Sequence, residues 1–278
     1  MSQRTTIEWA THTWNPVTGC TKVSQGCKHC YAERLAKRFS RRGILPGTDS
    51  EGNAVEWDTC ESPNGPDFQV LLHPERLDEP LHWRKPRLVF VCSMSDLFHE
   101  AVSDGFIQKV LQTARACPQH TFMFLTKRPE RMRLALLATD CAGGCNGIDC
   151  RHLWFGVSVE DQATANKRIP LLLQTPAAVR FVSYEPALGP VDFTPWLGCD
   201  LENSSHGVLM PGVSWLICGG ESGPGARPMQ VEWAQSAADQ CSAAGVAFFM
   251  KQDSGYRSGQ QGRLPDALWS RKEWPDAR

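Results

Sequence analysis

Three cysteines near the start of the chain have the residue type and spacing to do chemistry: Cys20, Cys27 and Cys30. Six residues separate the first two thiols and two residues separate the last two. Gly19 and Gly26 stand directly before the first two thiols and allow the backbone to fold tightly there. A closed zinc or iron–sulfur site takes four ligands, so three thiols leave the open position that a catalytic metal centre needs. The alternative is a zinc knot completed by His12 or His29.

A second cluster lies in the middle of the chain: Cys141, Cys145, Cys150 and His152. Four nitrogen and sulfur ligands suit a closed tetrahedral zinc site. The cluster precedes an expected strand, which places it on the face opposite the carboxyl ends of the strands. A structural zinc, free or paired cysteines, and an auxiliary iron–sulfur cluster all remain open interpretations of this segment.

Composition narrows the class of protein. The 278 residues carry 29 Lys and Arg against 30 Asp and Glu, which argues against a surface coated with phosphate contacts. No apolar run approaches the roughly 20 residues of a membrane span, and the first residues show no apolar signal segment. We therefore expect a cytoplasmic protein without membrane contact. In that compartment, clustered cysteines more often bind metal or do redox chemistry than form disulfides.

Short apolar runs alternate with helical patterns along the chain. The expected strands are 88–92, 121–126, 153–159, 179–184, 213–218 and 246–250, and the expected helices are 106–114, 129–138, 161–173 and 233–241. Strands that are apolar throughout are typical of parallel sheets covered on both faces. The alternation predicts an α/β fold with mostly parallel strands, open or closed into a full or partial barrel. We expect a single domain over 1–278 with insertions at 43–87 and 139–152 and a packed tail at 252–278.

Polar side chains follow the carboxyl ends of six expected strands. They are Ser93, Ser95, Asp96, Lys127, Arg128, Ser158, Glu160, Glu185, Glu221 and Lys251. Because parallel α/β folds bind ligands at this end of their strands, these residues indicate a ligand-binding rim. Ion pairs and solvated strand ends are the alternative explanation for each residue taken alone.

Several segments resemble a known superfamily. Around the first cysteines the sequence resembles the radical S-adenosylmethionine (SAM) superfamily, in which three cysteines hold a [4Fe-4S] cluster after the first strand of a partial (β/α)6 barrel. The chain is also similar to an uncharacterised, radical-SAM-like family found mainly in phages and prophages. That similarity lies in TIEWATHTWNPVTGC, KHCYAERLAKR, FLTKRPERM, FGVSVEDQ, SYEPALGP and ICGGESG. The usual superfamily spacing is three then two, whereas here it is six then two.

This resemblance implies a mechanism. Cys20, Cys27 and Cys30 would each bind one iron, and SAM would chelate the fourth. An external one-electron reductant would drive cleavage of SAM to a 5′-deoxyadenosyl radical, while the protein positions the reactants. The resemblance places SAM contacts at the rim and beside the cysteines: His29, Tyr31, Ser93, Ser95, Asp96, Lys127, Arg128, Ser158 and Glu160. We expect Glu185, Glu221 and Lys251 on the substrate side.

A nucleotide or DNA base is the expected substrate. The cations of segment 34–42 follow the cysteine loop and could attract phosphates, while Trp57, Phe68 and Trp83 could stack on an extruded base. Two other functions remain open: a zinc-stapled nucleic-acid-binding protein, and an α/β-barrel enzyme in which Glu185 and Glu221 do acid–base chemistry. Formation of 5′-deoxyadenosine from SAM separates them, because only the radical enzyme produces it.

Overall fold

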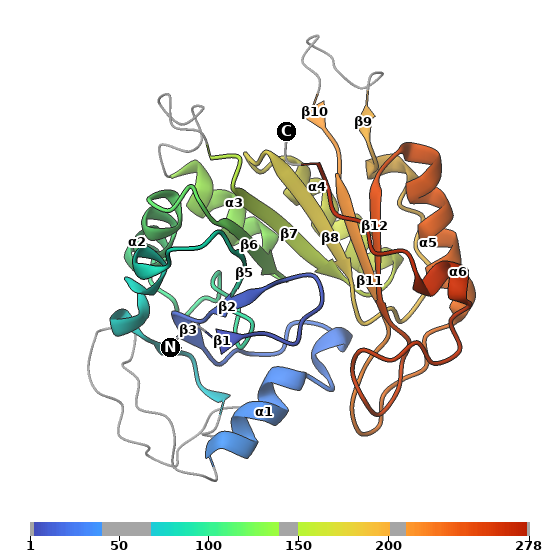
Figure 1. Ribbon diagram of the computed structural model, residues 1–278, viewed down its shortest axis with the longest axis horizontal. Coiled ribbons are helices and arrows are strands. Elements are labelled where there is room, and N and C mark those ends of the chain that lie inside the picture. The colour runs from blue at the N-terminus through green and yellow to red at the C-terminus, as the bar shows by residue number, and fades with distance from the viewer. Residues whose placement is uncertain (1–2, 41–67, 139–149, 201–209, 277–278) are drawn as a thin grey trace. The chain divides into compact units, whose positions relative to one another are not determined.

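The computed structural model describes residues 3–40, 68–138, 150–200 and 210–276, which belong to two compact units (Figure 1). Unit 1 is Met1–Leu153 and unit 2 is Trp154–Arg278. None of the helices in the described part of the chain is long and apolar enough to cross a membrane.

Unit 1 is built on parallel strands with one antiparallel edge. Its strand order is β1-β2-β5-β6, in which β1 (Gln3–Arg4) runs antiparallel to β2 (His12–Trp14). The next strands, β5 (Leu88–Val91) and β6 (Thr121–Thr126), are parallel to β2. A separate antiparallel pair joins β3 (Val17–Thr18) to β4 (Leu71–Leu72). The carboxyl ends of β2, β5 and β6 therefore lie at one edge.

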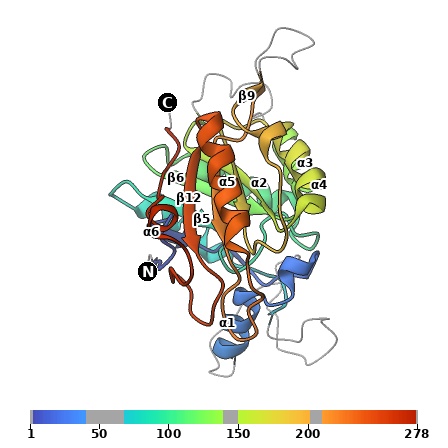
Figure 2. The same cartoon turned by 90° about the vertical axis from the view of Figure 1, so that its right-hand side faces the viewer.

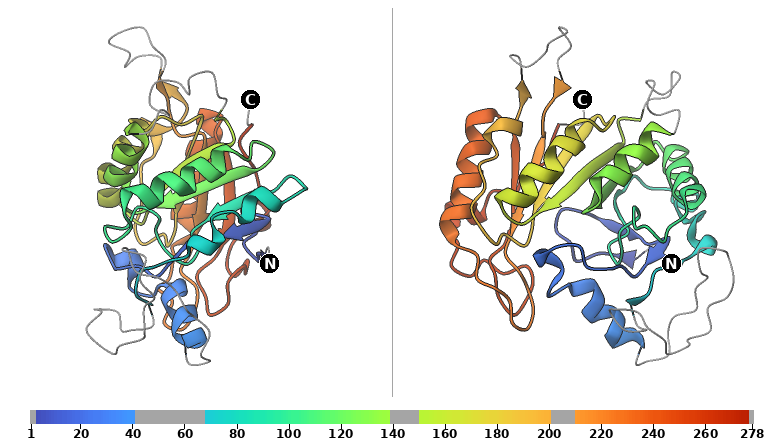
Figure 3. Two further views of the ribbon diagram at one scale, coloured as in Figure 1. Left: turned by 90° about the vertical axis from the view of Figure 1, so that its left-hand side faces the viewer. Right: turned by 180° about the vertical axis from the view of Figure 1, so that it is seen from behind.

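Helices cover the strands of unit 1. They are α1 (Tyr31–Ser40), α2 (Asp104–Arg115) and α3 (Pro129–Leu137), with short 3-10 turns η1 (Gln25–Cys27), η3 (Pro74–Arg76) and η4 (Glu79–His82). Ser103 caps α2 by accepting a hydrogen bond from the Phe106 amide at 3.3 Å. Gln108 of α2 donates to the Ala135 carbonyl of α3 at 3.2 Å, which ties the two helices together. Figure 3 shows α1 in blue, directly after the cysteine loop.

Unit 2 contains four parallel strands in the order β7-β8-β11-β12. They are β7 (Leu153–Val159), β8 (Val179–Tyr184), β11 (Trp215–Gly219) and β12 (Ala247–Gln252). A second pair, β9 (Cys199–Asp200) and β10 (Met210–Pro211), is antiparallel. Every residue of β7, β8 and β11 is buried, as strands packed on both faces require.

The helices of unit 2 have clear start and stop signals. They are α4 (Gln162–Leu173), α5 (Val231–Ala244) and α6 (Asp266–Trp269), with the 3-10 turn η6 (Thr194–Trp196). Asp161 and Thr164 form a capping box at the start of α4. Gly245 ends α5 with φ 65°, the left-handed conformation expected of a glycine in this position. Figure 2 shows α5 lying along β12.

The predicted α/β fold, a partial barrel of mostly parallel strands, is confirmed. All six expected strands and all four expected helices are present, with ends shifted by at most a few residues. The sequence analysis missed β1, β2, β3, β4, β9 and β10, because strands of two or three residues carry no readable periodicity. The single-domain assignment stays a prediction, and most of the insertions at 43–87 and 139–152 lie outside the described residues.

Candidate functional site

The cysteine loop, which carries Cys20, Cys27 and Cys30, lies after β2 in the chain. Hydrogen bonds of its backbone hold its start in place. The Gly19 amide donates to the Met94 carbonyl at 3.0 Å, and the Cys20 amide donates to the Phe68 carbonyl at 3.3 Å. Gly19 has φ +81°, and a Cβ at this position would lie 1.6 Å from the Gln69 carbonyl oxygen. Only glycine fits such a close approach of two backbone segments. The start of the loop is thus fixed by residues distant in sequence.

All three thiols lie in this loop and are half-buried. Cys27 ends η1, with its sulfur 3.8 Å from the Ser24 hydroxyl. Cys30 stands at the N-terminus of α1, where its carbonyl accepts from the Arg34 amide at 3.2 Å. Cys20 and Cys30 pack against the same small apolar cluster, formed by Ala32, Ala36 and Phe68.

The donor set of the loop suits an iron–sulfur cluster. Across the described ranges, no group of three or more His, Cys, Asp or Glu side chains is gathered at metal-binding distance, so the thiols share a loop without forming a closed cage. Three thiols leave one iron for another ligand. The N-terminus of α1 favours the negative charge that thiolates bring to Cys30. The loop therefore supplies three donors of the kind that a cluster with one open iron would need.

Arg128 connects the loop to the ends of β5 and β6. Its side chain is only 6% exposed. One guanidinium nitrogen, Nη1, lies 3.5 Å from the Cys20 sulfur and 3.2 Å from an Asp96 oxygen. Nη2 donates to the Thr21 hydroxyl at 2.9 Å, and Nε donates to both Glu100 oxygens at 3.0 Å. All three guanidinium nitrogens have partners, so Arg128 is held in one orientation beside Cys20.

Asp96 is the buried counter-charge of Arg128. Its carboxylate also accepts hydrogen bonds from the Thr126 hydroxyl at 2.7 and 2.9 Å, from the Lys127 amide at 3.2 Å and from the Phe98 amide at 3.0 Å. These bonds join the segment after β5 to the end of β6. The Asp96–Arg128 pair therefore fixes the rim of unit 1 as well as the loop.

His99 adds a further contact to the loop. Its Nδ1 accepts from the Ala101 amide at 3.0 Å, so the neutral ring carries its proton on Nε2 and donates it to the Thr21 hydroxyl at 2.8 Å. Burial, and then the charge of Arg128, lower the pKa of His99 and favour this neutral form.

The electrostatics of the loop favour a protonated thiol in the absence of metal. Burial, and then the charge of Asp96, raise the pKa of Cys20 to about 12, while Arg128 opposes the shift. Burial lowers the pKa of Arg128, but Asp96 and Cys20 raise it more, so Arg128 stays charged. A bound metal cation is the kind of charge that converts a buried thiol to thiolate.

Two of the expected SAM contacts bind the segment directly before the cysteine loop. The Ser93 hydroxyl donates to the Asn15 side-chain oxygen at 3.1 Å, and the Ser95 hydroxyl donates to the Val17 carbonyl at 2.8 Å. The Tyr31 hydroxyl donates to the Ser93 carbonyl. Asn15 was missed by the sequence analysis, although its position directly after β2 is the signal that could have found it. His29 is half-buried between Cys27 and Cys30.

The expected ribose contacts lie in unit 2 and are buried. The side chain of Glu160 is 1% exposed and accepts from Arg168 Nη1 at 3.2 and 3.0 Å. The same nitrogen donates to the Ser158 carbonyl at 2.7 Å. Arg168 thus ties the end of β7 to α4.

Two of the three expected substrate-side residues meet in unit 2. Lys251 Nζ lies 2.5 Å from Glu185 Oε1 at the carboxyl ends of β12 and β8, and each side chain is about one-fifth exposed. Glu221, which is 5% exposed, accepts from the backbone amide and Nε of Arg227 at 2.9 and 3.0 Å. The sequence analysis did not anticipate the Arg227 contact, because arginine in a glycine- and proline-rich loop carries no pattern.

The second cysteine cluster is only partly described. Cys141 and Cys145 lie outside the described residues. The His152 Nε2 lies 3.1 Å from the Ala114 carbonyl oxygen, next to α2. Within the described part of unit 1, nothing supports a zinc at Cys150 and His152.

Comparisons with known proteins give one family match. The model of a family described as a protein of unknown function, DUF5131, matches residues 4–272. No curated protein matches the chain. Among solved structures, a double mutant of spore photoproduct lyase with bound AdoMet and dinucleoside spore photoproduct aligns at 10% identity with a TM-score of 0.45, covering 96% of this chain and 61% of that chain. A cysteine-to-serine mutant of the lyase aligns at 10% identity with a TM-score of 0.45, covering 79% and 58%. The chain thus spans about three-fifths of the length of the lyase.

Proposed function

The chain belongs to the DUF5131 family, whose function is unknown, and we propose that it is a [4Fe-4S]-dependent radical SAM enzyme that modifies a nucleotide or DNA base. The observation that carries the proposal is the half-buried loop with Cys20, Cys27 and Cys30, held in place by Gly19 and Arg128. When bound, the reduced cluster would supply the electron that cleaves SAM to methionine and a 5′-deoxyadenosyl radical.

The residues around the loop position and insulate the thiols in this proposal. Cys20, Cys27 and Cys30 each bind one iron as thiolates. Arg128 places a fixed positive charge beside Cys20, which offsets part of the negative charge that three thiolates bring into a half-buried site. The packing of Cys20 and Cys30 against Phe68 excludes water from one side of the loop.

Four of the proposed SAM contacts already hold other parts of the protein. Ser93, Ser95, Asp96 and Arg128 already bind the loop, the segment before it or each other, so as SAM contacts they would exchange one partner for another. His29 lies between Cys27 and Cys30 in the sequence, Tyr31 is 43% exposed and Lys127 is half-buried. We propose these three as further SAM contacts.

Ser158 and Glu160 stay weaker proposals for the ribose. The Glu160 carboxylate binds Arg168 in the interior of unit 2, and separating that pair would leave a buried charge without its counter-ion. On the substrate side, Glu185 and Lys251 can accept and donate hydrogen bonds to the edge of a base, because both reach solvent. Glu221 supports the neighbouring loop through Arg227.

Acid–base catalysis by Glu185 and Glu221 is the alternative function. Each carboxylate is already paired with a cation, Lys251 in one case and Arg227 in the other. Either carboxylate would have to give up this partner before it could act on a substrate as a base or an acid. The geometry therefore favours the radical enzyme.

Anaerobic reconstitution with iron and sulfide tests the proposal. We expect about four irons per chain and a thiolate-to-iron absorption band in the visible, followed by 5′-deoxyadenosine when SAM and dithionite are added. Cys27→Ser should lose iron, whereas the matched control Cys117→Ala, a buried cysteine outside the loop, should retain it. A protein that binds less than one iron per chain after reconstitution would rule out the proposed function.

A further inference from the structure

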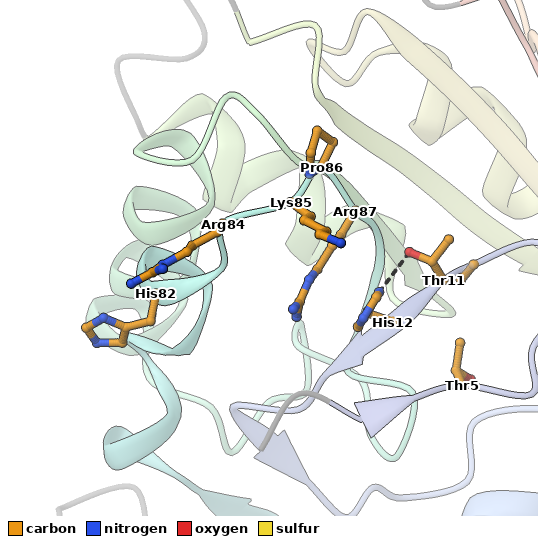
Figure 4. Close-up of a pocket in the computed structure, with 9 residues that line it drawn as sticks. Thr5, Thr11, His12, His82, Arg84, Lys85, Pro86 and Arg87 are labelled. Carbon is orange, nitrogen blue, oxygen red and sulfur yellow. Dashed lines mark hydrogen bonds between the residues drawn. The ribbon is translucent and has the colours of Figure 1, made fainter.

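A basic hollow lies in unit 1 at the end of the strands opposite the cysteine loop. It is lined by Thr5, Ala10, Thr11, His12, His82, Arg84, Lys85, Pro86 and Arg87 and has a volume of about 830 Å³. Thr11 directly precedes β2 and Arg87 directly precedes β5, so the hollow lies at the amino ends of these strands. Figure 4 shows Lys85 and Arg87 beside His12, with Arg84 and His82 farther out.

The charge of this hollow is of one sign. Its lining contains three permanent cations and two imidazoles, and no carboxylate is among the lining residues. The whole chain has a formal charge of −1, so this concentration of positive charge is local. A concave surface that carries a single sign of charge attracts ligands of the opposite sign.

Arg87 carries a buried hydrogen-bond donor that has no partner among the described residues. Its guanidinium carbon lies 4.5 Å from the centre of the Trp83 ring, which fixes the plane of the group. Its Nη1 is buried and has no hydrogen-bond partner among the described residues. Burial lowers the pKa of Arg87, which is the cost of a desolvated charge without a counter-ion. A buried donor without a partner is rare, and an oxyanion in the hollow would supply the partner.

The opposite wall of the hollow is also fixed. The Thr11 hydroxyl donates to the Leu88 carbonyl at 3.0 Å and accepts from the Leu88 amide at 3.0 Å. The single hydroxyl proton of Thr11 is donated to Leu88. In its contact with His12 Nδ1, at 2.9 Å, the Thr11 oxygen must therefore be the acceptor. The His12 ring is therefore protonated on Nδ1 and held in one orientation at the edge of the hollow.

We propose that this hollow binds a backbone phosphate of a polynucleotide. The fork of Arg87 matches the geometry of a phosphate. Arg84, Lys85 and Pro86 are exposed, so the positive charge continues from the hollow onto the surface, where further phosphates of the same strand would lie. An open hollow with cations at its margin suits a chain of phosphates better than an enclosed small molecule.

This site would anchor a strand at a distance from the reacting base. The strand β2 separates the hollow from the start of the cysteine loop, and its three residues span about 10 Å at roughly 3.3 Å per residue. Contacts with phosphates position a nucleic acid without reading its sequence. Binding at the hollow does not depend on the proposed function, because none of its residues belongs to the cysteine loop.

The test uses the full chain without metal, so its outcome is separate from that of cluster assembly. Binding of a fluorescein-labelled single-stranded oligonucleotide is followed by anisotropy across a range of salt concentrations. The variant combines Arg84→Ala with Lys85→Ala, two exposed residues of the lining. The control combines Lys109→Ala with Lys167→Ala, two exposed lysines that do not line the hollow, and it removes the same charge. We expect the variant to lose about 10-fold in affinity and its salt slope to fall by about 1.4, or 0.7 for each lost phosphate contact.

Three outcomes would overturn the assignment. The variant could bind with unchanged affinity and salt slope, or the control could lose as much affinity as the variant. The protein could also bind inorganic pyrophosphate by calorimetry while binding no oligonucleotide at low salt, which would assign the hollow to a small phosphate compound. As a further check, Arg87→Lys keeps the charge but removes the fork, and it should weaken oligonucleotide binding by several-fold without lowering the thermal midpoint of unfolding by more than about 2 °C.

Discussion

Replacing Arg128 with glutamine tests the most connected residue of the cysteine loop. Asp96 is 8% exposed on its side chain and would lose its counter-ion. Removing one partner of a buried ion pair costs about 3 to 5 kcal/mol, because the other charge stays buried. Asp96 keeps its bonds from Thr126 and from two backbone amides, which places the expected cost near the lower limit, about 3 kcal/mol. Loss of the ion pair between Arg128 and Glu100 adds little to this cost, because the side chain of Glu100 is 68% exposed.

The assay is thermal unfolding of three variants followed by circular dichroism. At roughly 2 °C per kcal/mol for a chain of this size, Arg128→Gln should lower the midpoint by about 6 °C. The double variant with Asp96→Asn removes both charges and should recover at least half of that loss. The reasoning would be refuted if the midpoint of the double variant fell by the sum of the decreases of the two single variants. A decrease below about 2 °C for Arg128→Gln would refute it as well. Cys20 should also react more slowly with iodoacetamide in Arg128→Gln, relative to the buried Cys117 of the same chain, because Arg128 lowers the pKa of the Cys20 thiol.

Three further predictions concern single positions. Gly19→Ala should prevent stable packing of the loop against Gln69 and lower iron binding after reconstitution, whereas Gly105→Ala, where a Cβ meets nothing within 4 Å, should not. Burial, and then the charge of Arg76, lower the pKa of His73 to about 4. The unfolded chain therefore binds this proton below about pH 6.5, whereas the folded chain binds it only below about pH 4. The free energy of unfolding should thus fall by up to about 3 kcal/mol as the pH is lowered from about 6.5 to about 4. Urea unfolding of His73→Gln should show a smaller decrease over the same pH range. Lys251→Met should lower the thermal midpoint by only about 2 °C, because its pair with Glu185 is partly exposed, while product formation should fall by 10-fold or more if the pair contacts substrate.

The sequence identified the parts of the fold that depend on local pattern. The apolar runs that became β5, β7 and β8 are buried along nearly their whole length, so their periodicity carried the structural information. Gly245 stopped α5 where a left-handed residue was expected. The cysteine loop was recognised by residue type and spacing, since three thiols in a short segment are rare outside metal sites.

The partners of the rim residues could not be read in the same way. Asp96 and Arg128 lie on segments that follow different strands, and their contact depends on the register of β5 against β6. Sequence shows that a strand ends in a polar residue, but not whether that residue faces a ligand or an internal counter-charge. The hollow at Arg87 was missed for a related reason, because its lining comes from segments far apart in the chain.

Exposure distinguishes the carboxylates at the strand ends more clearly than residue type does. Four of them are no more than 8% exposed on their side chains and are each paired with an arginine: Asp96, Glu160, Glu221 and Asp253. A carboxylate buried against an arginine is turned inward, so it stabilises the end of its strand and cannot approach a ligand without separating from its partner. Glu185 differs, because it is 21% exposed and its partner is Lys251, whose flexible ammonium group can exchange partners at low cost. Among these carboxylates, Glu185 is therefore the one whose surroundings permit contact with a substrate.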